Sequence, residues 1–169
     1  LLRIKKRTDR MISMRLNHCT LCSGVGHALG QLNAFDRALI TAGVSDYNLV
    51  KISSILPPNC QQEGKILLPK GLLLPTAMAT IFSDIVGTRL SAAVAIAIPQ
   101  NSNDIGVIME HSAHSAKEET EEQVHTYACQ AMNDRHIRIK EIISISTECY
   151  VELPEYYCAF ASASLWGFP

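Results

Sequence analysis

Two adjacent serines, Ser53 and Ser54, lie in an apolar segment between Ile52 and Ile55. The aliphatic residues of positions 48–56 favour a β-strand, which the two following prolines must end. Two neighbouring hydroxyls inside such a strand need hydrogen-bond partners. For serine pairs in general, the nearby backbone supplies those partners. The segment has no Gly-x-Ser-x-Gly pattern, so the nucleophile elbow of a serine hydrolase is excluded.

Cysteine residues form a second group with chemically relevant spacing. Cys19 and Cys22 make a Cys-x-x-Cys, but no second such pair and no histidine pair completes a zinc site. No clear helix follows Cys22, although a redox pair usually precedes one. We therefore expect buried, reduced thiols and, without a signal peptide, a cytoplasmic protein. The cysteines are Cys19, Cys22, Cys60, Cys129, Cys149 and Cys158.

A carboxylate and two histidines stand close together at Glu110, His111 and His114. Their order differs from the His-Glu-x-x-His of zinc proteases, and they cross the expected end of a strand. We expect these histidines to face solvent or the rim of a site. The sequence therefore predicts no metal centre.

The elements that must position these residues are strands and two helices. Strands are expected at 16–22, 48–56, 72–83, 89–98, 105–110, 137–149 and 157–166. A glycine-rich loop at 23–30 lacks the phosphate-binding patterns and precedes the first helix. That helix has one apolar face, a cap at Asn33 and Gly43 at its end. The face comprises Leu32, Phe35, Leu39 and Ala42. The second helix, 116–134, starts with glutamates, and the element order indicates an α+β fold with helices covering packed sheets.

Length and composition set the frame for this fold. The 169 residues correspond to about one domain, and charged residues make up only 18%. So few charges favour a surface partly buried in an oligomer. The net charge of -1 excludes a general attraction to nucleic acid or to an anionic membrane. No apolar run reaches the ~18 residues of a membrane-spanning helix.

The chain start differs from the rest in composition. Six of the 15 lysines and arginines fall within residues 1–15. We expect a basic, disordered arm there, with Met11 and Met14 as alternative start positions. Residues 16–169 are expected to form the domain.

Several blocks of the sequence, taken in order, resemble the pyruvoyl-dependent arginine decarboxylases. The most specific is Ser-Ser-Ile-Leu-Pro-Pro at 53–58, within a longer match at 48–58. The further blocks are 32–36, 91–99, 108–110, 158–161 and 165–166. The resemblance spans about residues 16–166 and implies fold, activity and site residues.

The resemblance implies that the chain cuts itself between Ser53 and Ser54. The Ser54 hydroxyl attacks the Ser53 carbonyl, elimination frees Ser53 as a new carboxyl end, and residue 54 becomes a pyruvoyl group. A β chain then ends at Ser53 and an α chain starts at Ser54. Asn48 matches a family residue needed for this maturation, although its type alone indicates a turn. The covalent pyruvoyl group serves as the electron sink, without pyridoxal phosphate or a metal.

Two carboxylates have roles by the same resemblance. Glu110 matches the proton donor that acts after carbon dioxide leaves, and Asp36 matches the residue that pairs with the substrate guanidinium. By residue type alone, they are a strand-end glutamate and a helix-surface aspartate. Arg37 departs from the small residue usual after this Asp, and it could occupy Asp36. Because helical neighbours point about 100° apart, we expect Arg37 to face elsewhere.

The implied protein is a four-layer αββα sandwich that forms homotrimers, with each active site between two subunits. Its implied reaction converts L-arginine to agmatine and carbon dioxide, a step that suits polyamine biosynthesis. Arg37 and the loop 23–30 depart from the family pattern near the substrate pocket, which bears on the choice of substrate and not on the decarboxylation. One alternative is a pyruvoyl decarboxylase of another amino acid such as histidine. The other is an unprocessed, non-catalytic homologue that serves as a structural subunit.

Overall fold

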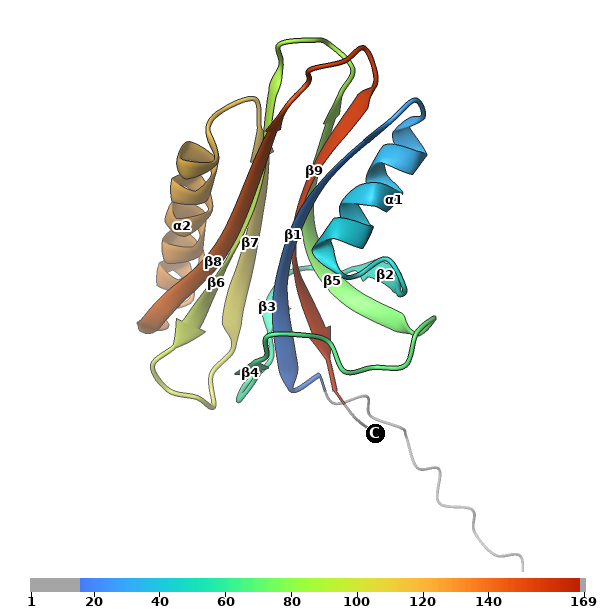
Figure 1. Ribbon diagram of the computed structural model, residues 1–169. Coiled ribbons are helices and arrows are strands. Elements are labelled where there is room, and N and C mark those ends of the chain that lie inside the picture. Colours follow the sequence, from blue (N-terminus) through green and yellow to red (C-terminus); the bar gives the residue numbers. More distant parts are fainter. Residues whose placement is uncertain (1–15, 168–169) are drawn as a thin grey trace, which may run out of the picture.

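The computed structural model describes residues 16–167 of the chain, and these form an α+β sandwich of four layers (Figure 1). Helix α1 (Gln31–Ala42) covers one sheet, and helix α2 (Lys117–Asp134) covers the other. The two sheets face each other between the helices. This layering agrees with the fold expected from the sequence. The predicted basic arm, residues 1–15, lies outside the described residues.

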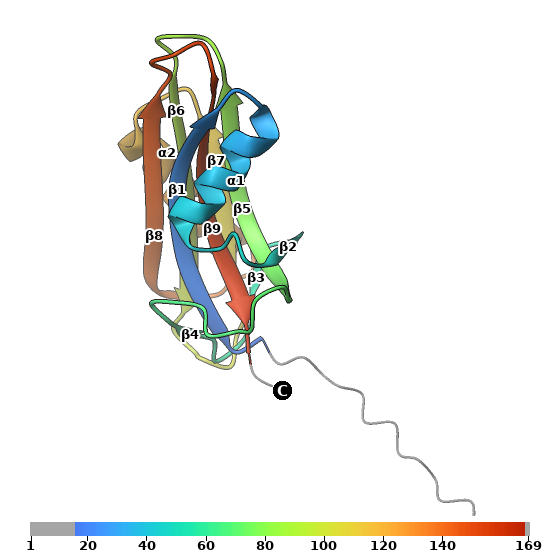
Figure 2. The ribbon, with the colours of Figure 1, turned by 45° about the vertical axis from the view of Figure 1, so that its right-hand side comes forward.

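One sheet has five strands in the order β2-β5-β9-β1-β4. Its strands are β1 (His18–Ala28), β2 (Asn48–Lys51), β4 (Gln61–Gln62), β5 (Leu73–Ser83) and β9 (Tyr156–Trp166). The central strand β9 runs antiparallel to both β1 and β5. The last strand of the chain is therefore the middle of this sheet, as the turned view shows (Figure 2).

The other sheet has four strands in the order β3-β7-β6-β8. Its strands are β3 (Ile55–Leu56), β6 (Arg89–Pro99), β7 (Gly106–Ala113) and β8 (Ile139–Tyr150). Strand β6 is almost wholly buried, since α2 covers one face and the five-stranded sheet covers the other. Val94 and Ile96 enter the core between the sheets, whereas Ala93 and Ala95 leave room for α2. The predicted strand of small residues at 89–98 is thus confirmed.

Helix α1 packs unusually close to β1 because two glycines of that strand have no side chain. A Cβ at Gly24 would stand 2.3 Å from the Ala38 carbonyl oxygen, and one at Gly26 would stand 2.4 Å from that of Ala34. The sequence prediction of a glycine-rich loop at 23–30 was therefore wrong for residues 23–28, which belong to β1. These glycines extend the strand to Ala28 and permit the close approach of the helix.

The expected ends of α1 are confirmed only in part. Gly43 ends the helix with a φ of 77°, as its position predicted. Asn33 does not cap the start, because Gly30 holds that position without a side-chain hydrogen bond. Leu32 was wrongly assigned to the core face, since it is 78% exposed. The other predicted residues of that face, Phe35, Leu39 and Ala42, do pack into the core. The small residues Ala34 and Ala38 lie closest to the strand.

The chain passes from one sheet to the other between Lys51 and Ile55. Strand β2 belongs to the five-stranded sheet, whereas β3 belongs to the four-stranded sheet. Residues 52–54 between them are in neither strand. The single strand predicted at 48–56 was therefore wrong, and the two serines lie at the crossing between the sheets.

The remaining expected elements are confirmed within a few residues. The helix predicted at 116–134 is α2, with Glu118 and Glu119 in its first turn. The strands predicted at 72–83, 137–149 and 157–166 are β5, β8 and β9. Within residues 16–167, neither helix has the length and hydropathy needed to cross a membrane.

Candidate active site

Ser54 has a strained backbone at the crossing between the sheets. Its φ is 68°, in the left-handed region that a serine adopts at a cost of about 1–2 kcal/mol. Contacts on the C-terminal side of Ser54 hold this conformation. The Ser54 carbonyl accepts a hydrogen bond of 2.8 Å from the Ile108 amide, and the next residues, Ile55 and Leu56, pair with β7. Ser53, on the preceding side, is exposed.

The Ser54 hydroxyl donates a hydrogen bond of 2.9 Å to Glu110 Oε2. Glu110 lies on β7, two residues beyond Ile108, so the same strand fixes both the backbone and the side chain of Ser54. Among the side-chain hydrogen bonds of residues 16–167, this is the one that reaches the Glu110 carboxylate. A carboxylate so placed can take the proton of the hydroxyl or return one to an atom at position 54.

Glu110 also lines a surface pocket of about 260 Å³. Lys51, from the end of β2, lies in the same pocket, as does His111. The remaining lining residues are Met78, Ala79, Thr80 and Ser112. A small substrate can therefore approach Glu110 from solvent. Sequence reasoning did not single out Lys51. Its proximity to Glu110 cannot be predicted from the sequence, because the two residues lie on strands of different sheets.

Asn48 lies at the start of β2, and the structure does not bring its side chain to the serine pair. Its amide donates a hydrogen bond of 2.8 Å to the Gly71 carbonyl, and its backbone amide donates to Leu72. Asn48 therefore ties the start of β2 to the segment that leads into β5. Asn48 can therefore influence Ser53 and Ser54 only indirectly, by fixing the position of β2.

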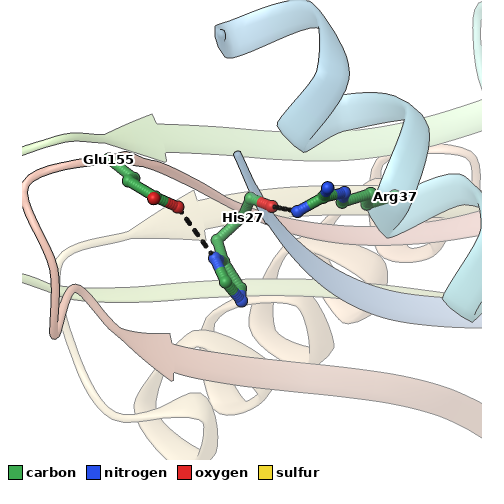
Figure 3. A network of polar contacts seen from close by, with 3 residues as sticks. All are labelled: His27, Arg37 and Glu155. Atoms are coloured by element: carbon green, nitrogen blue, oxygen red, sulfur yellow. Dashed lines mark hydrogen bonds and ion pairs between the residues drawn. The ribbon is translucent and has the colours of Figure 1, made fainter. Parts of the chain in front are cut away.

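Asp36 lies on α1 in a different pocket, of about 480 Å³. Neither Ser54 nor Glu110 lines this pocket. Arg37 lies beside Asp36 in the sequence, but its guanidinium donates to the backbone carbonyl of His27 (Figure 3). Within residues 16–167 no ion pair joins Arg37 to Asp36. Arg37 therefore does not occupy Asp36, although both residues line the same pocket.

The residues that suggested redox or metal chemistry are dispersed. Cys19 faces the core between the sheets and Cys22 faces α1, because residues three apart on a strand point to opposite faces. Cys19 instead contacts Cys60, whose thiol hydrogen bond lowers the pKa of Cys19. Cys129 is exposed, so the prediction of burial was wrong for that thiol.

The two histidines after Glu110 also have separate surroundings. The His111 ring makes an edge contact with Tyr127, at 5.8 Å between centroids. His114 Nδ1 lies 3.1 Å from the Arg89 carbonyl oxygen. Each lines a different surface pocket, as expected for residues at a rim. No group of three potential metal ligands occurs among residues 16–167.

Together, these features define an α+β sandwich with a hydroxyl–carboxylate pair where the chain crosses between its sheets. The family model of pyruvoyl-dependent arginine decarboxylases matches residues 18–166. The chain therefore belongs to the pyruvoyl-dependent arginine decarboxylase family.

Individual members of the family support the same assignment. The chain is 44% identical to the pyruvoyl-dependent arginine decarboxylase of Methanococcus aeolicus, over 89% of this chain and 90% of that protein. It is 40% identical to that of Methanocaldococcus jannaschii over the same shares. It is 39% identical to that of Pyrococcus abyssi, over 72% of this chain and 78% of that protein. The similarity thus extends over nearly the whole described fold.

Proposed function

We propose that this chain cuts itself between Ser53 and Ser54 and then decarboxylates L-arginine to agmatine and carbon dioxide. The observation that carries the proposal is the Ser54–Glu110 hydrogen bond at a strained crossing between the sheets, in a chain of this family. The chain is a carbon–carbon lyase, and the family uses a covalent pyruvoyl group. The reaction needs neither pyridoxal phosphate nor a metal.

Position 54 fits the origin of that group. Its hydroxyl is adjacent to the Ser53 carbonyl in the chain, and Glu110 can accept the hydroxyl proton as the oxygen attacks. The amide between the serines then becomes an ester. Elimination breaks the ester, leaves Ser53 as a carboxylate, and hydrolysis at residue 54 releases ammonia and leaves the pyruvoyl group. Cleavage also relieves the unfavourable φ of Ser54.

The fold keeps the new chain end beside Glu110 after the cut. Residue 54 retains its carbonyl bond to Ile108, and β3 stays paired with β7. The exposed end at Ser53 has no such anchor in the four-stranded sheet, so it can move aside and admit substrate. Asn48 supports this separation, because it fixes the start of β2 to the other sheet.

A pyruvoyl group at position 54 supplies an electron sink for the bond that breaks as carbon dioxide leaves. Glu110, at hydrogen-bond distance from that position, returns a proton after this step. Asp36 binds the guanidinium of arginine through two parallel hydrogen bonds. This division of roles assigns the reacting end of the substrate to β7 and its distal end to α1.

One chain does not complete this site, because Asp36 and Glu110 line different pockets. We infer that two copies share each site and that the working assembly is a homotrimer or a multiple of it. The test mixes Asp36→Asn chains with Glu110→Gln chains, each of which is poorly active alone. Mixed assemblies contain some sites with both native residues, so activity should return. If mixing restores nothing, shared sites are excluded.

The intact mass of the purified chain under denaturing conditions tests the self-cleavage. The expected products are fragments 1–53 and 54–169, the second with a blocked amino end. Activity assays with arginine and histidine then compare the two substrates. A single uncut chain after long incubation, without decarboxylation, would establish the structural-subunit alternative. A cut chain that decarboxylates histidine and not arginine would establish the alternative of a pyruvoyl decarboxylase of another amino acid.

A further inference from the structure

The pocket around Asp36 contains a second carboxylate, that of Glu155. Glu155 directly precedes β9, and the ladder between β1 and β9 pairs Ala28 with Tyr156. This register brings Glu155 to the end of β1, close to where α1 begins. Sequence reasoning missed Glu155, because nothing in the sequence shows that the last strand of the chain pairs with the first.

Its position is fixed by polar contacts. His27 Nδ1 donates to Glu155 Oε2 at 3.1 Å, and Arg37 donates to the His27 carbonyl (Figure 3). The His27 ring stacks on Tyr157, with 4.9 Å between the ring centroids. The Glu155 side chain is only 26% exposed. The pocket therefore holds a placed carboxylate instead of a freely rotating surface glutamate.

The charges of the pocket show why this carboxylate matters. Its charged lining residues are Asp36, Glu155 and Arg37. These two carboxylates and one guanidinium leave one net negative charge. Without Glu155, Arg37 would cancel Asp36. The amino end of α1 adds partial positive charge at Gly30, and its first turn carries no acidic residue.

We propose that Glu155 determines specificity for the guanidinium end of the substrate by offsetting the positive charge of Arg37. This inference rests on the proposed function for the identity of the substrate. Arg37 is then tolerated next to Asp36 because the end of the β8–β9 loop supplies a second acid. The pocket regains the single negative charge that matches one guanidinium.

A purely structural role for Glu155 would give different results. In that role, Glu155 only holds the loop through His27, and losing its charge would weaken cationic and neutral ligands alike. In the proposed role, removing the charge of Glu155 weakens the binding of cationic ligands alone. Removing the charge of Arg37 as well then restores that binding. The charge of the ligand and the charge of residue 37 therefore separate the two roles.

The experiment compares Glu155→Gln, Arg37→Gln and the double variant with the native chain. Glutamine at 155 can still accept from His27, and glutamine at 37 can still donate to the His27 carbonyl. Glu155→Gln should raise KM for arginine about tenfold with kcat unchanged. The double variant should return KM to near the native value. Glu152→Gln is the matched control, because this exposed glutamate of the same loop does not line the pocket.

A binding measurement makes the result independent of turnover. Titration calorimetry on the uncut Ser54→Ala chain uses agmatine and its neutral ureido analogue as probes. Adding Glu155→Gln should weaken the binding of agmatine about tenfold and leave the binding of the neutral analogue unchanged. Equal weakening of both probes, or no weakening of agmatine, overturns the role of Glu155. Failure of the native chain to decarboxylate arginine overturns the proposed function but not this binding result.

Discussion

Half-buried serine and glutamate side chains meet in two places beside the four-stranded sheet in the described part of the chain. Ser54 binds Glu110 where the chain crosses between the sheets. On the other edge of the sheet, Ser144 and Ser146 of β8 both donate to Glu121 of α2. His125 Nε2 lies 2.8 Å from the Ser144 hydroxyl oxygen. By residue types alone, this second group, with serine, histidine and carboxylate together, is closer to a catalytic triad.

The difference between the pairs lies in the backbone and in the free capacity of the carboxylate. Ser54 has a φ of 68°, whereas Ser144 lies within the regular ladder between β8 and β6. Both oxygens of Glu121 already accept from serines, whereas Glu110 accepts from Ser54 and faces a pocket. Ser144 is also bound as a donor to Glu121. We infer that the second group stabilises the α2–β8 contact and that reactivity needs strain and access.

The largest expected contrast is in self-cleavage. Ser54→Ala removes the attacking hydroxyl, so the chain should stay whole, with no fragment 54–169 in its denatured mass spectrum. Ser144→Ala, the matched control, should be cut as fully as the native chain. Cleavage of the Ser54→Ala chain would rule out attack by this hydroxyl. Failure of the Ser144→Ala chain to cut would show that the two pairs are not separate.

The next contrast is in turnover. Glu110→Gln should lower kcat by about 10²–10⁴, because glutamine cannot donate the proton that follows loss of carbon dioxide. Glu121→Gln should leave kcat unchanged. Activity is measured per cut chain, with the cut fraction taken from the intact mass. This correction separates slower maturation from slower turnover. Native turnover by the Glu110→Gln enzyme would remove its role as donor.

The sequence predicted the long, periodic strands and helices well, but not how they pack and pair with one another. Strands β5 and β9 and helix α2 were predicted because each carries a continuous pattern in its own residues. The break at residues 52–54 was missed, because Ile52 and Ile55 suggested one continuous apolar strand, whereas β2 ends at Lys51 and β3 of the other sheet starts at Ile55. Gly24 and Gly26 were assigned to a loop, since the helix that needs their missing side chains packs there only in the folded chain.

The site shows the same limit. Ser54, Glu110 and Asp36 were predicted as site residues through the family resemblance, and the structure adds the hydrogen bond between the first two. Ser54 and Glu110 stand 56 positions apart in the chain, and this spacing gives no hint of their contact. The serine–glutamate group on α2 was likewise invisible, because it depends on which face of α2 meets β8. Pairings between distant elements need the fold.

The smallest expected effect is the contribution of Glu121 to stability. Hydrogen bonds from Ser144 and Ser146 lower the pKa of this partly exposed carboxyl in the folded chain. A lowered pKa stabilises the fold above the unfolded-state pKa of glutamate, about 4.3, and this stabilisation is lost as the pH falls through the lower folded-state value. Because solvent screens this partly exposed carboxylate, its contribution to the free energy of unfolding is limited to about 1 kcal/mol.

Urea unfolding at matched protein concentration therefore compares the native chain with Glu121→Gln at pH 7 and at several values below pH 4. The variant should be less stable at pH 7, and the difference should shrink as the native carboxylate becomes protonated. Glu122→Gln, at the exposed neighbouring position of α2, should match the native chain throughout. A Glu121→Gln deficit that persists unchanged in acid would assign the loss to packing. The serine–carboxylate bonds would then carry no part of the stability, and the structural role of this second pair would have to be abandoned.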